Sequence, residues 1–264
     1  MDPLQAIIDQ VVSTPVLLVA TDFDGTLSPL IEEFDRPLPS RHAMAALERM
    51  AALANTRVAV VSGRGLVDLQ ARIGVHRGWE YCGSHGAEIA GERVDPIGPE
   101  SARQISRIRE RLDALAREHP GSAVERKSRG VAFHYRGTEE SRVARLESAL
   151  LELSRNAHGL CVRTGSCVVE YQVDTLTKAD GLRRIQERTH ATAVLFIGDD
   201  RTDEDAFRAL GPADAGVKVG AGPTAARFRV EGIAAVEALL ARLADERRAR
   251  APVESPRTVE GERA

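Results

Sequence analysis

Cysteine and aromatic residues are scarce in this 264-residue sequence, and neither sign of charge dominates it. The three cysteines are odd in number and lack CxxC spacing, so the sequence indicates neither a disulfide framework nor a zinc cluster, and a reducing cytoplasm fits. One Trp, three Tyr and six Phe are too few for a base-stacking platform, and a net charge of -3 gives no basic excess to hold a nucleic-acid backbone. We therefore expect no nucleic-acid partner.

Long apolar runs are also missing. No apolar segment is long enough to cross a bilayer, and the amino terminus has no positive region ahead of a long apolar segment, so we expect neither a membrane span nor an export signal. Hydrophobic residues make up 43% of the chain and charged residues 28%, which is typical of globular proteins that bury a full core. The oligomeric state is left open.

An acidic loop follows the apolar run 16–20. A short β-branched run that breaks into Asp and Gly predicts a buried strand ending in a loop, with Asp22 and Asp24 projecting to one side. Two carboxylates so close favour a cation between them, and oxygen ligands favour Mg²⁺ over zinc or copper. The alternative is an ordinary Asp-Gly turn.

Strand and helix patterns alternate through most of the sequence. Further apolar strands are predicted at 58–61, 79–82, 194–197 and 217–220. This alternation is typical of an α/β fold with a parallel sheet covered by helices on both faces. Such sheets bind ligands beyond the carboxyl ends of their strands, so the acidic loop, Ser62, Lys178 and Asp199 should meet at one edge. Taken singly, each motif also fits a turn or an acidic helix start.

The pattern changes between residues 95 and 172. Two successive helices are each followed by a predicted hairpin, which is typical of an α+β layer. We interpret 95–172 as an inserted cap domain and 1–94 with 173–246 as the core. From 247 to 264 charges and prolines replace the apolar periodicity, so we expect a disordered tail there.

Four motifs, taken in order, resemble those of the haloacid-dehalogenase (HAD) superfamily of phosphatases. They are Asp22-Phe23-Asp24-Gly25-Thr26, Ser62-Gly63-Arg64, Lys178, and Gly198-Asp199-Asp200 with Asp203. The combination covers the core, a little over half the chain. Further motifs are similar to those of the trehalose-6-phosphate phosphatases: Gly83-Ser84-His85-Gly86-Ala87-Glu88, Glu125-Arg126-Lys127, His134-Tyr135-Arg136 and Glu170.

The resemblance implies a HAD-like, Rossmann-type core and a magnesium-dependent hydrolysis of trehalose 6-phosphate to trehalose and phosphate. Asp22 would be the nucleophile that forms an aspartyl-phosphate, and Asp24 the general acid and then the base. Asp22, the backbone carbonyl of Asp24, and Asp199 would hold the metal ion. The implied partner is a small-molecule sugar phosphate.

The resemblance also implies which residues bind the two ends of the substrate. Thr26, Ser62, Gly63 and Lys178 would bind the phosphate, with Asp200 and Asp203 supporting the lysine or the metal ligands. Arg64, His85, Glu125, Lys127, Arg136 and Glu170 would bind the rest of the substrate. Two departures stand out: Ala179 replaces the Gly that commonly follows the lysine, and Gln172-Val173 replaces a basic residue and Pro.

Other functions remain open at this stage. A phosphatase for another sugar phosphate or for a glycosyl-glycerate phosphate could use the same cap, and a mutase is also compatible with the motifs. A phosphoacceptor signalling domain uses a strand-end aspartate, magnesium and a lysine, but it would not need Asp24 or so large a cap. A regulatory binding protein with a disabled site is the last alternative, although every expected catalytic position is filled.

Overall fold

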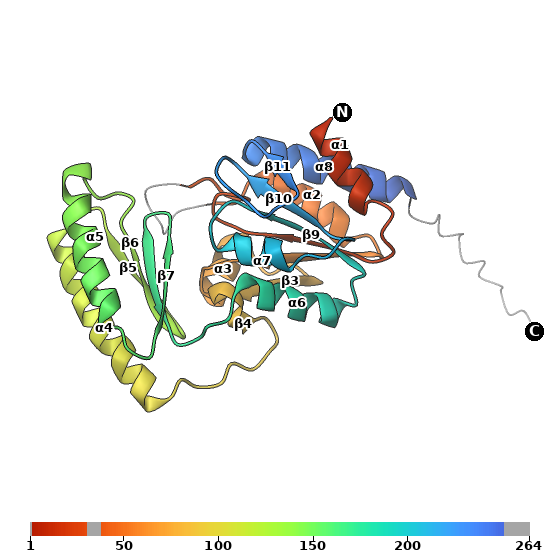
Figure 1. Ribbon diagram of the computed structural model, residues 1–264. Helices are drawn as coiled ribbons and strands as arrows, with labels where there is room; N and C mark the ends of the chain where they lie inside the picture. The colour runs from red at the N-terminus through yellow and green to blue at the C-terminus, as the bar shows by residue number, and fades with distance from the viewer. Residues whose placement is uncertain (1, 31–37, 251–264) are drawn as a thin grey trace, which may run out of the picture.

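The computed structural model of this chain describes residues 2–30 and 38–250. Its large sheet consists of β1 (Leu17–Thr21), β2 (Thr56–Val61), β3 (Trp79–Gly83), β4 (Glu88–Ile89), β9 (Ala193–Gly198), β10 (Ala215–Val219) and β11 (Phe228–Val230). The strands lie in the order β11-β10-β9-β1-β2-β3-β4, and all neighbouring pairs except β3 and β4 are parallel (Figure 1). The predicted α/β fold with a parallel sheet is confirmed.

The centre of the large sheet positions the acidic loop. β1 lies between β2 and β9, and all five of its residues are buried. The loop after β1 therefore leaves the sheet beside the carboxyl ends of both neighbours. The edge strands β4 and β11 were not predicted, because two and three residues are too few to show a repeat in hydrophobicity.

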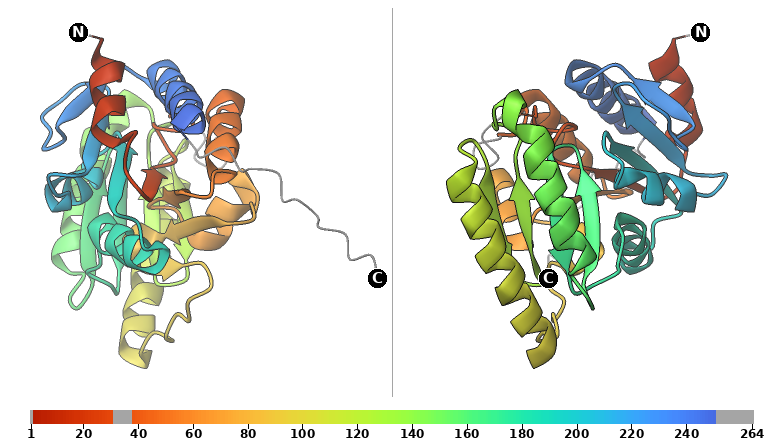
Figure 2. Two further views of the ribbon diagram at one scale, coloured as in Figure 1. Left: turned by 90° about the vertical axis from the view of Figure 1, so that its right-hand side faces the viewer. Right: turned by 60° about the vertical axis from the view of Figure 1, so that its left-hand side comes forward.

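Helices cover both faces of the large sheet. They are α1 (Pro3–Val11), α2 (Arg41–Ala51), α3 (Leu66–Ile73), α6 (Lys178–Thr189), α7 (Asp203–Ala209) and α8 (Ile233–Arg250). Figures 1 and 2 show α1, α2 and α8 on one face and α6 and α7 on the other. Successive side chains of β1 point to opposite faces of the sheet, so Val19 packs under α1, α2 and α8 and Leu18 packs against α6 and α7. No helix within the described ranges is long and apolar enough to cross a bilayer.

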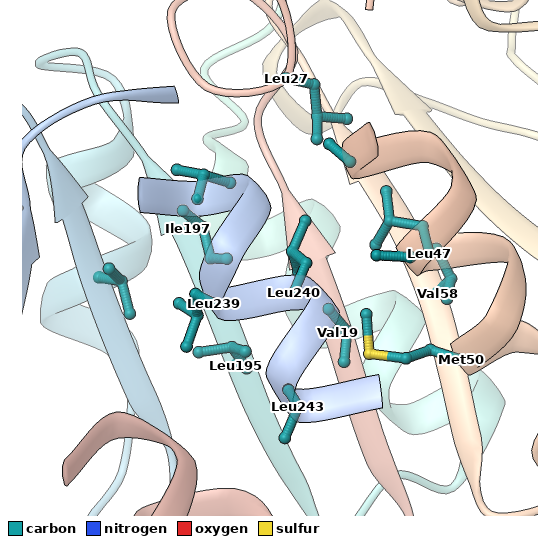
Figure 3. Close-up of a cluster of buried hydrophobic side chains, with 14 of the residues drawn as sticks. Val19, Leu27, Leu47, Met50, Val58, Leu195, Ile197, Leu239, Leu240 and Leu243 are labelled. Carbon is teal, nitrogen blue, oxygen red and sulfur yellow. The ribbon is translucent and has the colours of Figure 1, made fainter. Parts of the chain in front are cut away.

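The layer under α2 and α8 is the largest hydrophobic cluster (Figure 3). The side chains labelled there are all fully buried: Val19, Leu27, Leu47, Met50, Val58, Leu195, Ile197, Leu239, Leu240 and Leu243. Burying a side chain of this size contributes about 2 kcal/mol. Leu27 and Phe23 of the acidic loop belong to the same cluster, so the loop is anchored in the core on the side away from its acids.

The carboxyl-terminal helix is longer than the sequence predicted. We expected a disordered tail from residue 247, whereas α8 continues to Arg250 and Arg247 is only 2% exposed. The Arg247 guanidinium donates hydrogen bonds to the carbonyl oxygens of Val11, Val12, Thr14 and Asn55 and to Oγ1 of Thr56. The expected start of the tail was wrong because a charged residue occupies a buried position of the helical repeat. The remainder of that tail, 251–264, lies outside the described residues.

A second unit follows β4 and precedes α6. It consists of α4 (Pro99–Glu118), β5 (Ala123–Lys127), β6 (Gly130–His134), α5 (Glu140–Arg155), β7 (Cys161–Gly165) and β8 (Val168–Gln172). Its four strands form a small antiparallel sheet in the order β5-β6-β8-β7. The helices α4 and α5 lie on the side of this sheet that faces away from the large sheet (Figures 1 and 2).

Alternation along the strands gives the small sheet two unlike faces. Val131, Phe133 and Tyr171 point toward α4 and α5 and form a separate hydrophobic cluster with their side chains. On the opposite face, register places Glu125 beside Ala132 and Ala132 beside Glu170. The charged face is therefore the one turned toward the large sheet.

We expect Arg247→Met to destabilise the protein by about 3 kcal/mol, because several acceptors would lose their donor where water cannot replace it. Arg248→Met is the matched control: its side chain is exposed on the same helix, so its effect should stay within about 0.5 kcal/mol. Urea unfolding at pH 7 measures both variants. Equal stabilities would show that Arg247 does not hold these segments together.

Candidate active site

A pocket lies between the loops at the carboxyl edge of the large sheet and the charged face of the small sheet. From the large-sheet part it is lined by Asp22, Asp24, Ser62, Gly63, Arg64, His85, Lys178, Asp199 and Asp200. From the small-sheet unit it is lined by Glu125, Lys127, Arg136 and Glu170, among others. The structure thus gathers every predicted site residue at this pocket except Thr26 and Asp203, which are completely buried beside it.

Three carboxylates converge below the pocket. Asp22 directly follows β1 and Asp199 directly follows β9, and these strands are parallel neighbours, so their ends are adjacent. Asp203 begins α7. One oxygen from each of the three carboxylates lies within 4.8 Å of the other two.

Lys178 ties two of these acids together. Its Nζ lies 2.8 Å from Oδ2 of Asp22 and 2.7 Å from Oδ1 of Asp203. Burial alone would lower the pKa of Lys178, but Asp203 and Asp22 raise it above its ordinary value, so the lysine stays charged. The substitution of Ala179 for the commoner Gly leaves the lysine in contact with the acids.

The acids are crowded enough to favour a cation. Burial raises the pKa of Asp22 above its ordinary value and that of Asp199 to about 7. The Asp203 carboxylate contributes to both shifts, and Lys178 opposes them. A set of carboxylate oxygens suits a hard divalent ion, which would relieve the repulsion between them. The donor set therefore fits a divalent metal ion.

Two glycines make room for these acids. A Cβ on Gly25, whose φ is +77°, would lie 2.1 Å from Oδ2 of Asp199. A Cβ on Gly198 would lie 2.3 Å from Cγ of Asp203. The glycines of the first and last motifs thus let carboxylates from separate segments approach the backbone.

Thr26 and Asp203 are buried beside the pocket and contact its charged side chains. Thr26 was expected to bind phosphate, but its hydroxyl donates to Oδ1 of Asp199 at 3.2 Å and does not reach the pocket wall. Asp203 was expected to support the lysine or the metal ligands; it contacts Lys178, and one of its oxygens also belongs to the carboxylate cluster. The Thr26 contact depends on the pairing of β1 with β9, and the position of Asp203 depends on how α7 packs against β9, so sequence spacing could show neither.

Arg64, an expected substrate ligand, lines the pocket and contacts two acids. Its Nε and Nη2 donate to the two oxygens of Asp24 at 2.6 and 2.8 Å, and its Nη1 donates to Asp68 at 2.9 Å. The guanidinium is 7% exposed and lies over the ring of Phe23. Arg64 therefore orients Asp24, while the carboxylate cluster itself consists of Asp22, Asp199 and Asp203.

Charged side chains of the small sheet reach the loops of the large sheet. Nζ of Lys127 lies 2.7 Å from Oε1 of Glu170 and donates to the carbonyl of Gly63 at 2.7 Å. Nε2 of His85 lies 3.1 Å from Oε2 of Glu170. A Cβ on Gly63 would strike the His85 ring at 2.5 Å, so this glycine gives the histidine room. These contacts fix the charged face relative to the acid cluster.

The ionisation of this group follows from burial and pairing. Burial alone would raise the pKa of Glu170, but Lys127 and His85 bring it far below its usual range. Burial lowers the pKa of His85, so the ring is neutral and its Nε2 carries the proton donated to Glu170. Glu125 is held by His134, whose Nε2 lies 2.9 Å from Oε2.

Two contacts to residues of the pocket were not found from the sequence. Gln172 donates to Oε2 of Glu170 at 2.6 Å. The residue that differs from the family pattern at position 172 therefore contacts Glu170, which was predicted to bind the sugar. Its place two residues after Glu170 could have shown that both share a face. Lys218 on β10 donates to the backbone carbonyl of Asp199, and a lysine inside an apolar strand was the available signal.

The sequence has relatives among known proteins. Residues 20–233 match the family model described as trehalose-phosphatase. Trehalose-phosphate phosphatase of Mycobacterium ulcerans is 35% identical over 253 residues, which cover 89% of this chain and 63% of the relative. The chain therefore spans less than two thirds of that protein's length.

Solved structures with a similar fold include two proteins of the same description. The C. albicans trehalose-6-phosphate phosphatase C-terminal domain superposes with a TM-score of 0.79 at 19% identity, covering 92% of this chain and 96% of that one. A trehalose-6-phosphate phosphatase related protein superposes with a TM-score of 0.72 at 24% identity, covering 88% and 99%. These likenesses confirm the fold that the sequence resemblance implied.

We expect Asp199→Asn to weaken divalent-cation binding at least tenfold, because one of three carboxylate ligands becomes neutral. Thermal unfolding in increasing MgCl₂ measures this: the melting temperature of the unsubstituted protein should rise and that of the variant should not. Asp205→Asn is the control, since Asp205 lies next to Arg208 outside the cluster. Equal shifts for the protein and for Asp199→Asn would place the cation elsewhere.

Proposed function

This chain belongs to the trehalose-phosphatase family, and from that premise we propose that it hydrolyses trehalose 6-phosphate to trehalose and inorganic phosphate. One observation carries the proposal: the carboxylate cluster with its lysine and the charged face of the small sheet meet at one pocket. Phosphoryl transfer needs the first group to stabilise charge, and a disaccharide with many hydroxyls needs the second.

In the first step, a carboxylate oxygen of Asp22 attacks phosphorus and the bond from phosphorus to the sugar oxygen breaks. The backbone N–H of Phe23 donates to Oδ1 of Asp22 at 2.6 Å and Lys178 contacts Oδ2, so the nucleophile is held in one orientation. Asp24 gives its proton to the departing sugar oxygen. The product of this step is an aspartyl-phosphate on Asp22.

In the second step, water attacks phosphorus and the bond to Asp22 breaks, which releases inorganic phosphate. Asp24, now ionised, takes the proton from the attacking water. Both Asp24 oxygens accept hydrogen bonds from Arg64 in the structure, so we infer that this side chain turns between Arg64 and the reacting oxygen during the cycle.

Mg²⁺ is the cofactor that we propose for this donor set. Asp22, Asp199 and the backbone carbonyl of Asp24 would hold it, with Asp203 close enough to share in binding. It would neutralise charge on the phosphoryl oxygens. Lys178, the Ser62 hydroxyl and the backbone of Gly63 would bind the same oxygens, while Thr26 would act by orienting Asp199.

Residues 95–172 would serve as a cap domain over a core made of 1–94 and 173–246. Glu125, Lys127, Arg136, Glu170 and His85 would hydrogen-bond the sugar hydroxyls. The contacts of Lys127 with Gly63 and of Glu170 with His85 join the two parts, so they would help exclude water during the reaction. All three cysteines are free, which agrees with the cytoplasmic location that we propose.

Trehalose 6-phosphate should be the preferred substrate. We expect its kcat/KM to exceed that of glucose 6-phosphate by about 100-fold, because loss of the second sugar leaves buried polar groups of the pocket without partners. Release of phosphate by the purified chain with MgCl₂ measures this, with mannosyl phosphoglycerate as a third substrate. Equal cleavage of all three esters would reject the substrate assignment.

Asp22→Asn should lower kcat at least about 1000-fold, because an amide is a poor nucleophile. The side chains have nearly the same volume, so circular dichroism and the melting temperature will show whether the variant still folds. Turnover near that of the unsubstituted protein would move the nucleophile to another residue.

A further inference from the structure

Arg163 of β7 lines the pocket and was not a predicted site residue. In the register of the small sheet it is the direct cross-strand partner of Glu170 on β8. The two form no ion pair. The Glu170 oxygens instead contact Lys127 of β5, His85 of the large-sheet part and Gln172 of β8 itself. Arg163 therefore forms no ion pair with the acid that lies directly opposite it in the sheet.

The hydrogen bonds of Arg163 go to the chain that leads into Lys178. Its Nη2 donates to the carbonyl oxygens of Thr175 and Leu176 at 3.0 and 2.6 Å. Leu176 is two residues before Lys178, so the guanidinium lies beside the start of α6. Its Nε is buried and has no hydrogen-bond partner in the described part of the chain. Protein groups thus leave a buried charged donor unsatisfied, which is unfavourable unless a ligand completes its contacts.

The other cations of the pocket are neutralised by nearby acids. Lys178 is paired with Asp22 and Asp203, Lys127 with Glu170, and Arg64 with Asp24 and Asp68. Within residues 2–30 and 38–250, Arg136 and Arg163 form no ion pair. Arg136 donates to the backbone carbonyl and the hydroxyl of Ser166, and Arg163 to the two carbonyls named above. Their charge is balanced by no described carboxylate.

We propose that Arg163 binds the phosphate dianion, both as the ester and as the released product. This rests on the proposed function, in which phosphate is the one charged part of the substrate. A guanidinium binds phosphate oxygens with strong, directed hydrogen bonds. Because Arg163 is anchored next to Lys178, its charge is placed on the lysine side of the pocket. It would add a cap-borne ligand to the phosphate ligands of the large-sheet loops.

The competing explanation is that Arg163 only ties the 173–177 linker through its two carbonyl contacts. Two variants separate the explanations. Arg163→Gln keeps an N–H donor for the carbonyls but removes the charge, and Arg163→Lys keeps both a donor and the charge. Arg126→Gln is the control, since Arg126 lies on the opposite face of the small sheet, near Asp113 and outside the pocket.

The experiment uses the full chain with MgCl₂. It measures KM and kcat for trehalose 6-phosphate and for p-nitrophenyl phosphate, and the Kd of inorganic phosphate by calorimetry. Arg163→Gln should raise both KM values and the Kd about tenfold, because a charged phosphate contact is lost. Arg163→Lys should stay within about threefold of the unsubstituted protein, since the charge remains while the planar fork is lost. Arg126→Gln should change none of these constants.

Two results would overturn the proposal. A rise in KM for trehalose 6-phosphate alone, with p-nitrophenyl phosphate and inorganic phosphate unaffected, would assign Arg163 to the sugar. Constants for Arg163→Gln that stay as close to those of the unsubstituted protein as the constants for Arg163→Lys would show that an uncharged donor suffices, and Arg163 would then only hold the 173–177 linker. Failure of the proposed function gives a different result. A chain that cleaves p-nitrophenyl phosphate but not trehalose 6-phosphate would lose its substrate assignment. The KM for p-nitrophenyl phosphate and the Kd of inorganic phosphate would still test the role of Arg163.

Discussion

Like charges held close together away from water are the constraint on which this structure depends. Asp22, Asp199 and Asp203 each bring a carboxylate oxygen to one small region, and repulsion would separate them without compensation. Lys178 compensates two of them, since its ammonium contacts Asp22 and Asp203. Burial and the neighbouring Asp203 carboxylate raise the pKa of Asp199, and this uncompensated negative charge makes the cluster suitable for a divalent ion.

The fold supplies this arrangement through a few local features. Parallel pairing of β1 and β9 brings two strand ends together, and the buried loop residues Phe23 and Leu27 hold the acidic loop against the core. Gly25 and Gly198 leave space that any side chain would fill. The small sheet then adds a second chemistry, because alternation gives it one face for packing against helices and one for charged groups. The carboxylate cluster and the charged face of the small sheet thus meet at one pocket.

Much of this could be predicted from the sequence. Parallel sheets bind ligands at the carboxyl edge, and acids follow two of the predicted strands. We therefore predicted that four residues would gather at this edge: Asp22, Ser62, Lys178 and Asp199. Family resemblance added Glu125, Lys127, Arg136 and Glu170, which do line the pocket. The order of helices and hairpins in 95–172 was also visible as changes in hydrophobic period.

Other features depend on partners far apart in the sequence, and no local pattern shows them. Arg247 was assigned to a disordered tail because its acceptors are backbone carbonyls of two distant loops. The contacts of Arg64 with Asp24 and Asp68 were not predicted, because their spacing in the sequence does not show that they meet. Arg163 and Lys218 likewise bind backbone carbonyls, which carry no residue-type signal. β4 and β11 are recognised only from their pairing with neighbouring strands.

In the proposed mechanism, the buried cluster positions Asp22 to accept a phosphoryl group. The most direct test mixes the chain with MgCl₂ and trehalose 6-phosphate labelled in its phosphate, stops the reaction with acid during turnover, and maps the label by peptide mass spectrometry. The account predicts a transient acyl-phosphate on the peptide that contains Asp22. Rapid release of phosphate with no labelled protein at any time, or label on a different residue, would contradict it.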